Sequence, residues 1–496
     1  MNWKSAWTAW IASLVAPPAG IVLHWLRPNI GIVKKVSYSL LVAVWGVKWL
    51  ILFFGLRVEA DGTGIPKFFT FRQPETHYAI LEQSRARQAV VAPVVEKTAP
   101  EPTPAPAVVK PAAGFWPDFR GPNRDGHYTE TPLLTPWPAT GLKRLWQQPA
   151  GGGYASFVVA EGRLYTIEQR RRREVVAAYD INTGRELWSN SWEADFRESM
   201  GGDGPRATPT WHEGRLYALG AQGEFRCLEA ASGKTLWRRN ILQENAAQNL
   251  QWGMAASPLI VDEKVIVLPG GGAGKSVAAY HKLTGEPVWK ALNDKQAYTA
   301  PMLVTLAGKR QIVVVSAERA MGLTTESGDL LWEYPWKTEY DVNAAQPIVA
   351  GPSRLFVSAG YGHGAAVIEI GISGDKFEAK TVWSNNRMKN KFSGAVLFEG
   401  HIYGLDEAIL ACINAETGEL KWKGGRYGYG QVLLASGHLV ITTETGDLVL
   451  VKATPESHQE LSRFPALSGK TWNVPALAGG KLFVRNATGM MAFAAQ

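Results

Sequence analysis

Nine side chains of this sequence bring aromatic, amide and cationic chemistry to points where its hairpin-rich segments connect. An indole can stack on a planar ligand, and a guanidinium or ammonium group can pair with carboxylates. The same residue types can equally line a hydrated opening whose loops recognise a protein. The candidate binding residues are Arg206, Trp252, Tyr298, Asn343, Gln346, Lys391, Gln431, Trp472 and Asn473.

Conventional catalytic motifs are missing from the sequence. The segment PGGGAGKS (269–276) is similar to a phosphate-binding loop, but Pro269 stands where the first glycine belongs and the segment joins two strands. The nine histidines form no HExxH or paired metal-ligand spacing, and GxSxG is absent. Glu198 and Asp203 are acidic residues near the candidate set, yet no motif supports them. No catalytic residue or metal ligand is therefore assigned.

The elements that position these residues follow from a repeat. Tryptophans recur at intervals of 39 to 52 residues, a period typical of propellers and arrays. The recurring positions are Trp146, Trp188, Trp237, Trp289, Trp332, Trp383, Trp422 and Trp472.

Five of these tryptophans close one eleven-residue pattern, as in AYDINTGRELW (178–188). Its glycine supplies the positive φ of a tight hairpin turn, and the tryptophan follows on the outgoing strand. The small first residue is predicted to leave room for an indole from a neighbouring blade. Alternating apolar and polar residues between the turns supply three further strands per repeat. We predict an all-β fold, an eight-bladed propeller of four-stranded antiparallel blades.

The two ends of the repeat region complement each other. Trp146 lies in LKRLWQQ (142–148) without strands of its own blade before it, whereas the chain ends on three strands without a fourth. We therefore expect segment 142–148 to complete the last blade, which removes an exposed sheet edge.

Cys227 and Cys412 are the two cysteines of the chain, and both occupy the small first position of the pattern. They lie four repeats apart, on opposite sides of a ring of eight. That separation exceeds the roughly 7 Å between Cα atoms that a disulfide tolerates. Two buried free thiols are expected.

The pattern and the segment FWPDFRGPNRDG (115–126) resemble those of the pyrroloquinoline quinone (PQQ)-like β-propeller repeat proteins. This superfamily includes the quinoprotein alcohol dehydrogenases and the non-enzymatic BamB proteins of outer-membrane barrel assembly. The resemblance covers about residues 115–496 and implies the fold, but not one activity.

Two functions remain open on this resemblance. The first is an interaction scaffold or binding module like BamB, for which no cofactor is expected and protein partners would bind through the propeller loops. The second is an alcohol or sugar dehydrogenase that uses PQQ with calcium. In that case Trp252 or Trp472 would stack on the quinone, and Arg206 or Lys391 would pair with its carboxylates. The adjacent cysteines and the CxxCH haem motif of many such enzymes are absent, which favours the scaffold.

The first 58 residues predict a membrane anchor. Segment 36–56 is apolar except for Lys48 and is long enough as a helix to cross a bilayer. A second apolar segment, 7–26, contains prolines and a glycine, so it is a second span, a re-entrant hairpin or an interfacial segment. The basic residues Arg27, Lys34 and Lys35 predict a cytoplasmic start and an extracytoplasmic propeller on the inner membrane, which excludes nucleic acid as a partner.

A linker, 59–113, is expected between the anchor and the propeller at 114–496. Its proline- and alanine-rich part from residue 92 favours extended polyproline II, a stiff spacer. The net charge of +8 is modest, and part of it is the run Arg170 to Arg173. We interpret this run as a solvated hairpin, with contact to an anionic lipid, polysaccharide or acidic partner as the alternative.

Overall fold

The computed structural model describes residues 6–28, 30–54, 56–60, 66–70, 75–90, 114–198, 201–374 and 376–496. The described chain forms two compact units. One contains residues 1–73 with 197–203, and the other contains residues 74–196 with 204–496. The linker prediction for 92–113 lies outside the described residues.

The N-terminal unit is helical, with one short hairpin. Its elements are α1 (Ala6–Val15), α2 (Pro17–Trp25), α3 (Ile32–Phe54), β1 (Leu56–Ala60) and β2 (Pro66–Thr70). The chain bends sharply at Ala16, where Pro17 starts α2, and Gly20 packs directly on Ser13 of α1. Trp45 Nε1 of α3 donates to Leu14 O of α1 at 3.2 Å. Within the described residues, none of the helices combines the length and apolar character required to span a bilayer.

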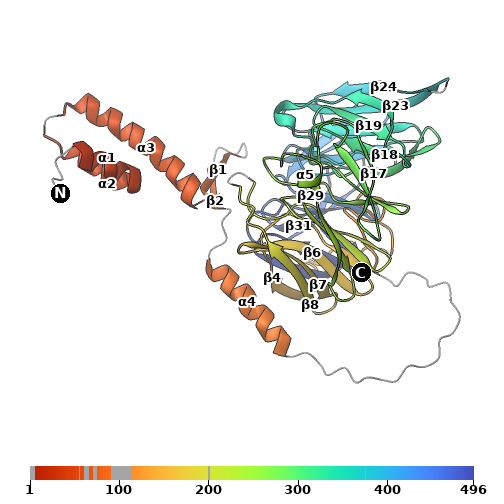
Figure 1. The fold of residues 1–496 in the computed structure, drawn as a ribbon, viewed down its shortest axis with the longest axis horizontal. Coiled ribbons are helices and arrows are strands. Elements are labelled where there is room, and N and C mark those ends of the chain that lie inside the picture. Colours follow the sequence, from red (N-terminus) through yellow and green to blue (C-terminus); the bar gives the residue numbers. More distant parts are fainter. Residues whose placement is uncertain are drawn as a thin grey trace. The chain divides into compact units, whose positions relative to one another are not determined.

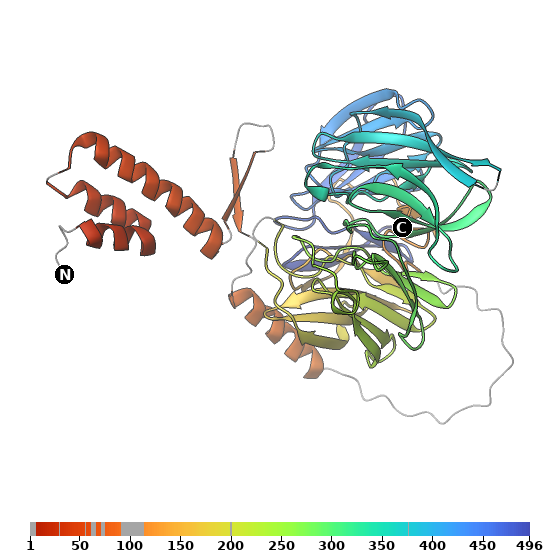
Figure 2. The ribbon, with the colours of Figure 1, turned by 45° about the horizontal axis from the view of Figure 1, so that its top comes forward.

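The second unit is an eight-bladed propeller, and its blades follow one another in sequence order from yellow to blue (Figures 1 and 2). Blade 1 contains β5 (Val158–Ala160), β6 (Arg163–Arg170), β7 (Arg173–Asp180) and β8 (Glu186–Glu193). Blade 2 contains β9 (Thr210–His212), β10 (Arg215–Leu219), β11 (Glu224–Glu229) and β12 (Thr235–Asn240). Blade 3 contains β13 (Leu259–Val261), β14 (Lys264–Val267), β15 (Val277–His281) and β16 (Pro287–Ala291). Blade 4 contains β17 (Met302–Leu306), β18 (Lys309–Val315), β19 (Arg319–Leu323) and β20 (Leu330–Pro335).

The second half of the ring repeats this arrangement. Blade 5 contains β21 (Ile348–Val349), β22 (Arg354–Ala359), β23 (Gly364–Ser373) and β24 (Lys376–Asn385). Blade 6 contains β25 (Val396–Phe398), β26 (His401–Asp406), β27 (Ile409–Asn414) and β28 (Leu420–Arg426). Blade 7 contains β29 (Gln431–Ala435), β30 (His438–Thr442), β31 (Asp447–Lys452) and β32 (Glu460–Pro465). Blade 8 contains β33 (Ala476–Ala478), β34 (Lys481–Arg485) and β35 (Gly489–Ala494).

Two strands from before blade 1 join the far end of the ring. The strand β4 (Arg144–Pro149) pairs antiparallel with β35 and gives blade 8 its fourth strand. The short β3 (His127–Tyr128) adds a parallel strand beside β29, which makes blade 7 five-stranded. The prediction of an eight-bladed all-β propeller is confirmed. Short additional turns are α5 (Ile241–Glu244) and η1 (Glu339–Asp341).

Neighbouring blades dock through the tryptophan of one and the turn glycine of the next. A Cβ built on Gly233 would lie 2.4 Å from the indole of Trp188, and one on Gly285 would lie 2.6 Å from Trp237. The Nε1 of Trp188 also donates to Ala230 O of the next blade at 3.0 Å. The glycine therefore serves the positive φ of its turn and the close approach of the neighbouring indole. The other docked pairs are Trp146 with Gly184, Trp289 with Gly328, and Trp383 with Gly418.

One detail of the repeat prediction was wrong. The small first residue of the pattern faces the tryptophan of its own blade and not a neighbour's, since Cys227 pairs across the strands with Trp237. Cys412 pairs with Trp422 in the same way. Trp472 follows β32 in the connection to blade 8, at one of the connecting points where the candidate residues were expected. Cys227 and Cys412 are buried free thiols, as expected.

A sixteen-residue helix, α4 (Glu75–Val90), belongs to the same unit as the propeller. Its residues Tyr78 and Leu81 are buried. The helix contacts β4 and the hairpin between β6 and β7.

Candidate functional site

An arc of aromatic side chains lies where the inner strands of the last blades begin. The ring of Trp472 is centred 5.2 Å from that of Tyr154 and 4.4 Å from that of Phe392. Phe392 in turn lies 5.5 Å from Tyr429. We call these four residues, contributed by connections of blades 1, 6, 7 and 8, the aromatic arc. Lys470 Nζ lies 3.0 Å from the centre of the Trp472 ring, so the arc combines π faces with positive charge.

Two further cations flank the aromatic arc. The guanidinium of Arg206 lies 4.6 Å from the ring centre of Phe196 and also approaches the arc at Tyr154. Lys391 Nζ lies between two rings, 4.4 Å from Tyr429 and 4.8 Å from Tyr361. Each cation is thereby held by ring quadrupoles at a defined place on the arc. The resulting surface presents aromatic faces and positive charges together.

The amide side chains of the candidate set bind to the backbone around the ring. Gln431 donates through Nε2 to Trp472 O at 3.0 Å and to Phe392 O at 3.3 Å, and so ties the connections of three blades. Asn473 donates to Ala155 O of blade 1 at 2.9 Å. These buried amides hold the arc in place, because their N–H groups are committed to backbone carbonyls. Gln346 and Asn343 behave likewise, with Ala300 O and Trp336 O as acceptors at 3.0 Å each.

The remaining two candidates form a separate aromatic pair. Trp252 follows blade 2 and Tyr298 precedes blade 4, and their ring centres lie 5.7 Å apart. The backbone N–H of Tyr298 donates to Asn343 O at 2.9 Å, which places Asn343 below this pair. The structure thus groups Arg206, Lys391, Gln431, Trp472 and Asn473 around the arc and the others on the side of blades 3 to 5.

The sequence interpretation missed the segment that spans the centre of the ring. Pro117 O accepts from Trp211 N of blade 2, and Gly126 O accepts from Leu434 N of blade 7. Between these points, Arg120 donates to Ala395 O at 2.8 Å and to Val432 O at 3.2 Å. We call residues 115–128 the central segment. Its signal was present in FRGPNRDG, whose two arginines and two glycines were used above only as a family resemblance.

Arg124 of the central segment reaches the opposite blades. Its Nη1 donates to Ser257 O at 3.2 Å and to Pro301 O at 2.7 Å, and its Nε donates to Asp118 at 2.9 Å. Burial raises the pKa of Asp118, although the Arg124 charge opposes that rise. Burial also lowers the pKa of Arg120 to about 10, which leaves it a cation at neutral pH. The centre of the ring therefore holds two buried guanidinium groups and one carboxylate.

The aromatic arc suits the quinone part of a PQQ site, but the residues around it do not suit the calcium ion. Calcium binds several oxygen ligands, with carboxylates foremost. The acid beside the arc is Glu444, which accepts from Trp472 Nε1 at 2.9 Å and from Tyr429 N at 3.3 Å. Over the part of the chain that the structure describes, no three His, Cys, Asp or Glu side chains converge. The aromatic and cationic groups suit a planar acid, whereas the donor set does not suit calcium, and no quinone step is assigned to these residues.

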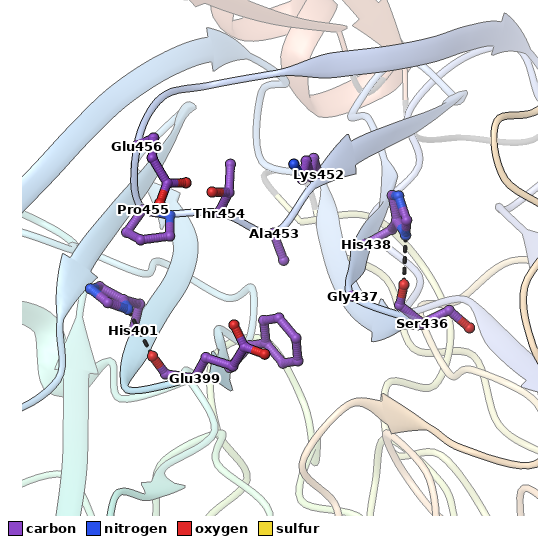
Figure 3. Close-up of a pocket in the computed structure, with 11 residues that line it drawn as sticks. Glu399, His401, Ser436, Gly437, His438, Lys452, Ala453, Thr454, Pro455 and Glu456 are labelled. Atoms are coloured by element: carbon purple, nitrogen blue, oxygen red, sulfur yellow. Dashed lines mark hydrogen bonds between the residues drawn. The ribbon is translucent and has the colours of Figure 1, made fainter.

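Away from the aromatic arc, a hollow of about 550 Å³ lies on the hairpins of blades 6 and 7 (Figure 3). His401 and His438 each place Nδ1 against the carbonyl of their own turn, at Glu399 O (2.9 Å) and Ser436 O (2.7 Å). A carbonyl can only accept, so Nδ1 carries the proton and Nε2 is the free acceptor of the neutral ring. The figure shows the two imidazoles on opposite sides of the hollow, with Ala453 between them. They do not share a ligand position.

Comparison with known proteins matches the repeat region. A profile of the family described as "Outer membrane protein assembly factor BamB" matches residues 172–424, half of the chain. The BamB of Burkholderia pseudomallei is 22% identical over 377 residues, which cover 65% of this chain and 91% of the relative. The 1-butanol dehydrogenase (cytochrome c) of Thauera butanivorans is 24% identical over 174 residues, 34% of this chain and 24% of the relative.

A solved structure gives the same fold. The quinohemoprotein alcohol dehydrogenase ADHIIG from Pseudomonas putida HK5 superposes with a TM-score of 0.50 at 12% identity, over 77% of this chain and 80% of that one. At this identity the likeness concerns the fold alone.

Proposed function

We propose, because this chain belongs to the family of the outer membrane protein assembly factor BamB, that it is an extracytoplasmic, membrane-anchored propeller that binds protein partners in envelope protein assembly. The relatives that span most of their own length in the comparison carry the BamB name. The dehydrogenase match covers a quarter of that enzyme. Family membership therefore favours the binding module over the oxidoreductase.

The aromatic arc is the observation that supports a protein-binding role most directly. Tyrosine, tryptophan and arginine dominate the energetic centres of protein interfaces, because they offer large rigid faces with a polar end. Trp472, Tyr154 and Tyr429 supply such faces, and Arg206 and Lys391 supply cations between them. The partner that fits this surface is a polypeptide segment with aromatic or apolar side chains next to carboxylates.

The N-terminal helices support membrane association. Large apolar side chains point to solvent along α1 and α3, among them Trp7, Leu14, Val33 and Leu40. Such a contiguous apolar surface is unfavourable in water and marks contact with a membrane or a protein. We assign the lipid bilayer as the contact, with Arg27 before α3 and Lys34 and Lys35 in its first turn on the cytoplasmic side. Carbonate extraction of membranes tests this: the full chain stays in the pellet, and a variant without residues 1–58 moves to the supernatant.

A site-specific crosslinking experiment tests the binding role. The photoreactive residue p-benzoylphenylalanine replaces Tyr429 of the arc in the full chain, expressed in intact cells. The matched control carries it at Leu283, an exposed residue of blade 3 away from the arc. We expect discrete protein adducts from position 429 and none from 283. Equal adducts from both positions, or none from position 429, would contradict a partner at the arc.

The dehydrogenase alternative has its own readout. The purified full chain is titrated with PQQ and calcium while the tryptophan fluorescence is followed, and dye reduction with alcohols is then measured. The scaffold proposal predicts no saturable binding and no turnover. One-to-one binding with turnover that is lost in Arg206→Ala would replace it with the oxidoreductase function.

A further inference from the structure

The helix α4 turns one face towards the seam where the last blade meets the first. Tyr78 and Leu81 on this face are buried. His77 Nε2 lies 2.8 Å from Ala150 O, just beyond the closing strand β4. One turn after Leu81, Arg85 Nη2 donates to Pro149 O at 2.7 Å. The spacing 77, 78, 81 and 85 is that of one helical face, so the whole length of the helix is seated.

Both blades that meet at the seam, blade 8 and blade 1, contact α4. Gln88 donates to Gln148 of β4 at 2.9 Å, and its Oε1 accepts from the backbone N–H of Glu186 in blade 1 at 2.9 Å. The guanidinium of Arg85 pairs with the same Glu186 at 3.2 Å and lies over the Tyr179 ring at 5.1 Å. The helix therefore bridges the closing strand of blade 8 and the outer strands of blade 1.

Arg171, in the turn between β6 and β7, contacts α4 beside the buried Tyr78. Arg171 Nε binds Glu82 Oε1 at 2.7 Å. Arg171 also pairs with Glu75, which lies about two helical turns before Glu82. Hydrogen bonding to Arg171 lowers the pKa of Glu82. Arg170, by contrast, turns inward to Glu168. The acidic partner of Arg171 is thus a helix of the same chain, whereas the interpretation of the run as a solvated hairpin is wrong for Arg170, whose side chain is 15% exposed.

We propose that α4 is a releasable strap that sets the length of the tether between the N-terminal unit and the propeller. The N-terminal unit ends at Gln73, and α4 begins at Glu75. While α4 is seated, the chain reaches the ring at this helix. When α4 leaves the seam, its sixteen residues join the tether. Fully extended, they add up to roughly 55 Å of reach.

The contacts of α4 are of the kind that salt and charge control. Two apolar side chains are buried, whereas the remaining contacts are hydrogen bonds and ion pairs. Glu75 and Glu82 are more than half exposed in their pairs with Arg171. Ion pairs that face water weaken as salt screens them. The helix should therefore open far more readily than the blades, whose middle strands, such as β6 and β7, are buried on both faces.

Hydrogen exchange on the full chain tests the strap. At low salt we expect the amides of residues 78–88 to be protected, and their exchange to rise about tenfold between roughly 0.02 and 0.5 M salt, as screening predicts. Arg171→Glu should remove the protection at low salt. The reversed pair Arg171→Glu with Glu82→Arg should restore it, which a loss of folding could not do. Arg172→Glu is the control, because Arg172 is exposed and makes no contact with α4 that the structure describes.

Fluorescence energy transfer measures the reach itself. Dyes are attached to Gly31→Cys in the N-terminal unit and Lys376→Cys on blade 5, both exposed, while the native cysteines are buried and resist labelling. Release by Arg171→Glu should broaden the distance distribution, and the reversed pair should narrow it again. Unprotected α4 amides in the unmodified chain, protection indifferent to salt and to charge reversal, or an unchanged distance distribution after release would each overturn the proposal.

Discussion

The indole of Trp146, on the strand that closes the ring, packs against Gly184 of blade 1. A Cβ on Gly184 would lie 2.6 Å from that indole. Trp146 Nε1 donates to Ile181 O in the same turn at 3.0 Å. The same contact joins blades 1 and 2, 2 and 3, 3 and 4, and 5 and 6, so the ring is closed by an ordinary docking contact and not by a special one.

Gly184→Ala should therefore destabilise the propeller by about 2–4 kcal/mol, because the methyl group collides with the indole and the residue keeps a positive φ. Gly162→Ala is the matched control, since its φ is +70° but nothing lies within 4 Å of its Cβ position. It should cost only about 1 kcal/mol, from the backbone conformation alone. Denaturant unfolding gives both values. Equal losses would show that the indole contact is not tight.

Arg124→Leu should destabilise the ring by about 3–5 kcal/mol, since it leaves Asp118 buried without its partner. Adding Asp118→Asn to Arg124→Leu should recover part of this loss, because the uncompensated charge disappears. Arg120→Met should cost less, for no carboxylate forms a hydrogen bond with Arg120 among the described residues. Chemical denaturation of the three variants checks the order. A loss no greater for Arg124→Leu than for Arg120→Met would argue against the buried pair.

Stability should decline as pH rises from about 4.5 to about 7 through one buried acid, Glu174. Burial raises its pKa to about 7, despite hydrogen bonds from Ala221 N and Trp192 Nε1. In this window the unfolded chain has released the proton that the folded chain still binds, so the free energy of unfolding falls as the pH rises. The loss is about 3 kcal/mol at most. Glu174→Gln should remove this component of the pH dependence, and an unchanged slope would mean that Glu174 ionises normally.

At acid pH the opposite behaviour should come from Glu168. Burial disfavours its charge, but Arg170, Arg485 and Arg85 outweigh burial and lower its pKa to about 2. Its contribution of about 3 kcal/mol is present above pH 4.5 and is lost as pH falls towards 2. Glu168→Gln should cost about 3–5 kcal/mol at pH 7, because it leaves Arg485 buried without its nearest carboxylate. Thermal unfolding between pH 2 and 7 measures both effects.

The repeat made the blades predictable, whereas the parts of the chain outside the repeat could not be predicted. The turn glycines and the tryptophans fix the hairpins, since each requires a specific backbone conformation or a close approach. Which indole a small residue faces could not be read from spacing, because the pattern alone does not show that Cys227 pairs across the strands with Trp237 of its own blade. Trp472 falls at the spacing of the repeat although it lies in a connection, because the length of that connection happens to match the period.

The candidate site was predictable in composition but not in arrangement. Arg206, Lys391 and Trp472 were named from their loops, whereas Tyr154 and Phe392, which join them into the arc, lack any repeat signal of their own. The roles of Arg120 and Arg124 depend on carbonyl groups at four blades, blades 3, 4, 6 and 7. The helix α4 was missed because its seat is made by residues about 65 to 100 positions further along the chain.

The position of β4 in the sequence also constrains the order in which the propeller can form during synthesis. This strand leaves the ribosome before every strand of blades 1 to 7 except β3, yet its partner β35 is the last of the described strands. Throughout synthesis the nascent propeller therefore carries an unpaired strand at its start and a growing edge at its end, and both can pair with other chains. Ring closure can occur only after the strands of blades 1 to 7 and β35 have all been made. A cell that makes this protein must protect those two edges for the whole interval between them.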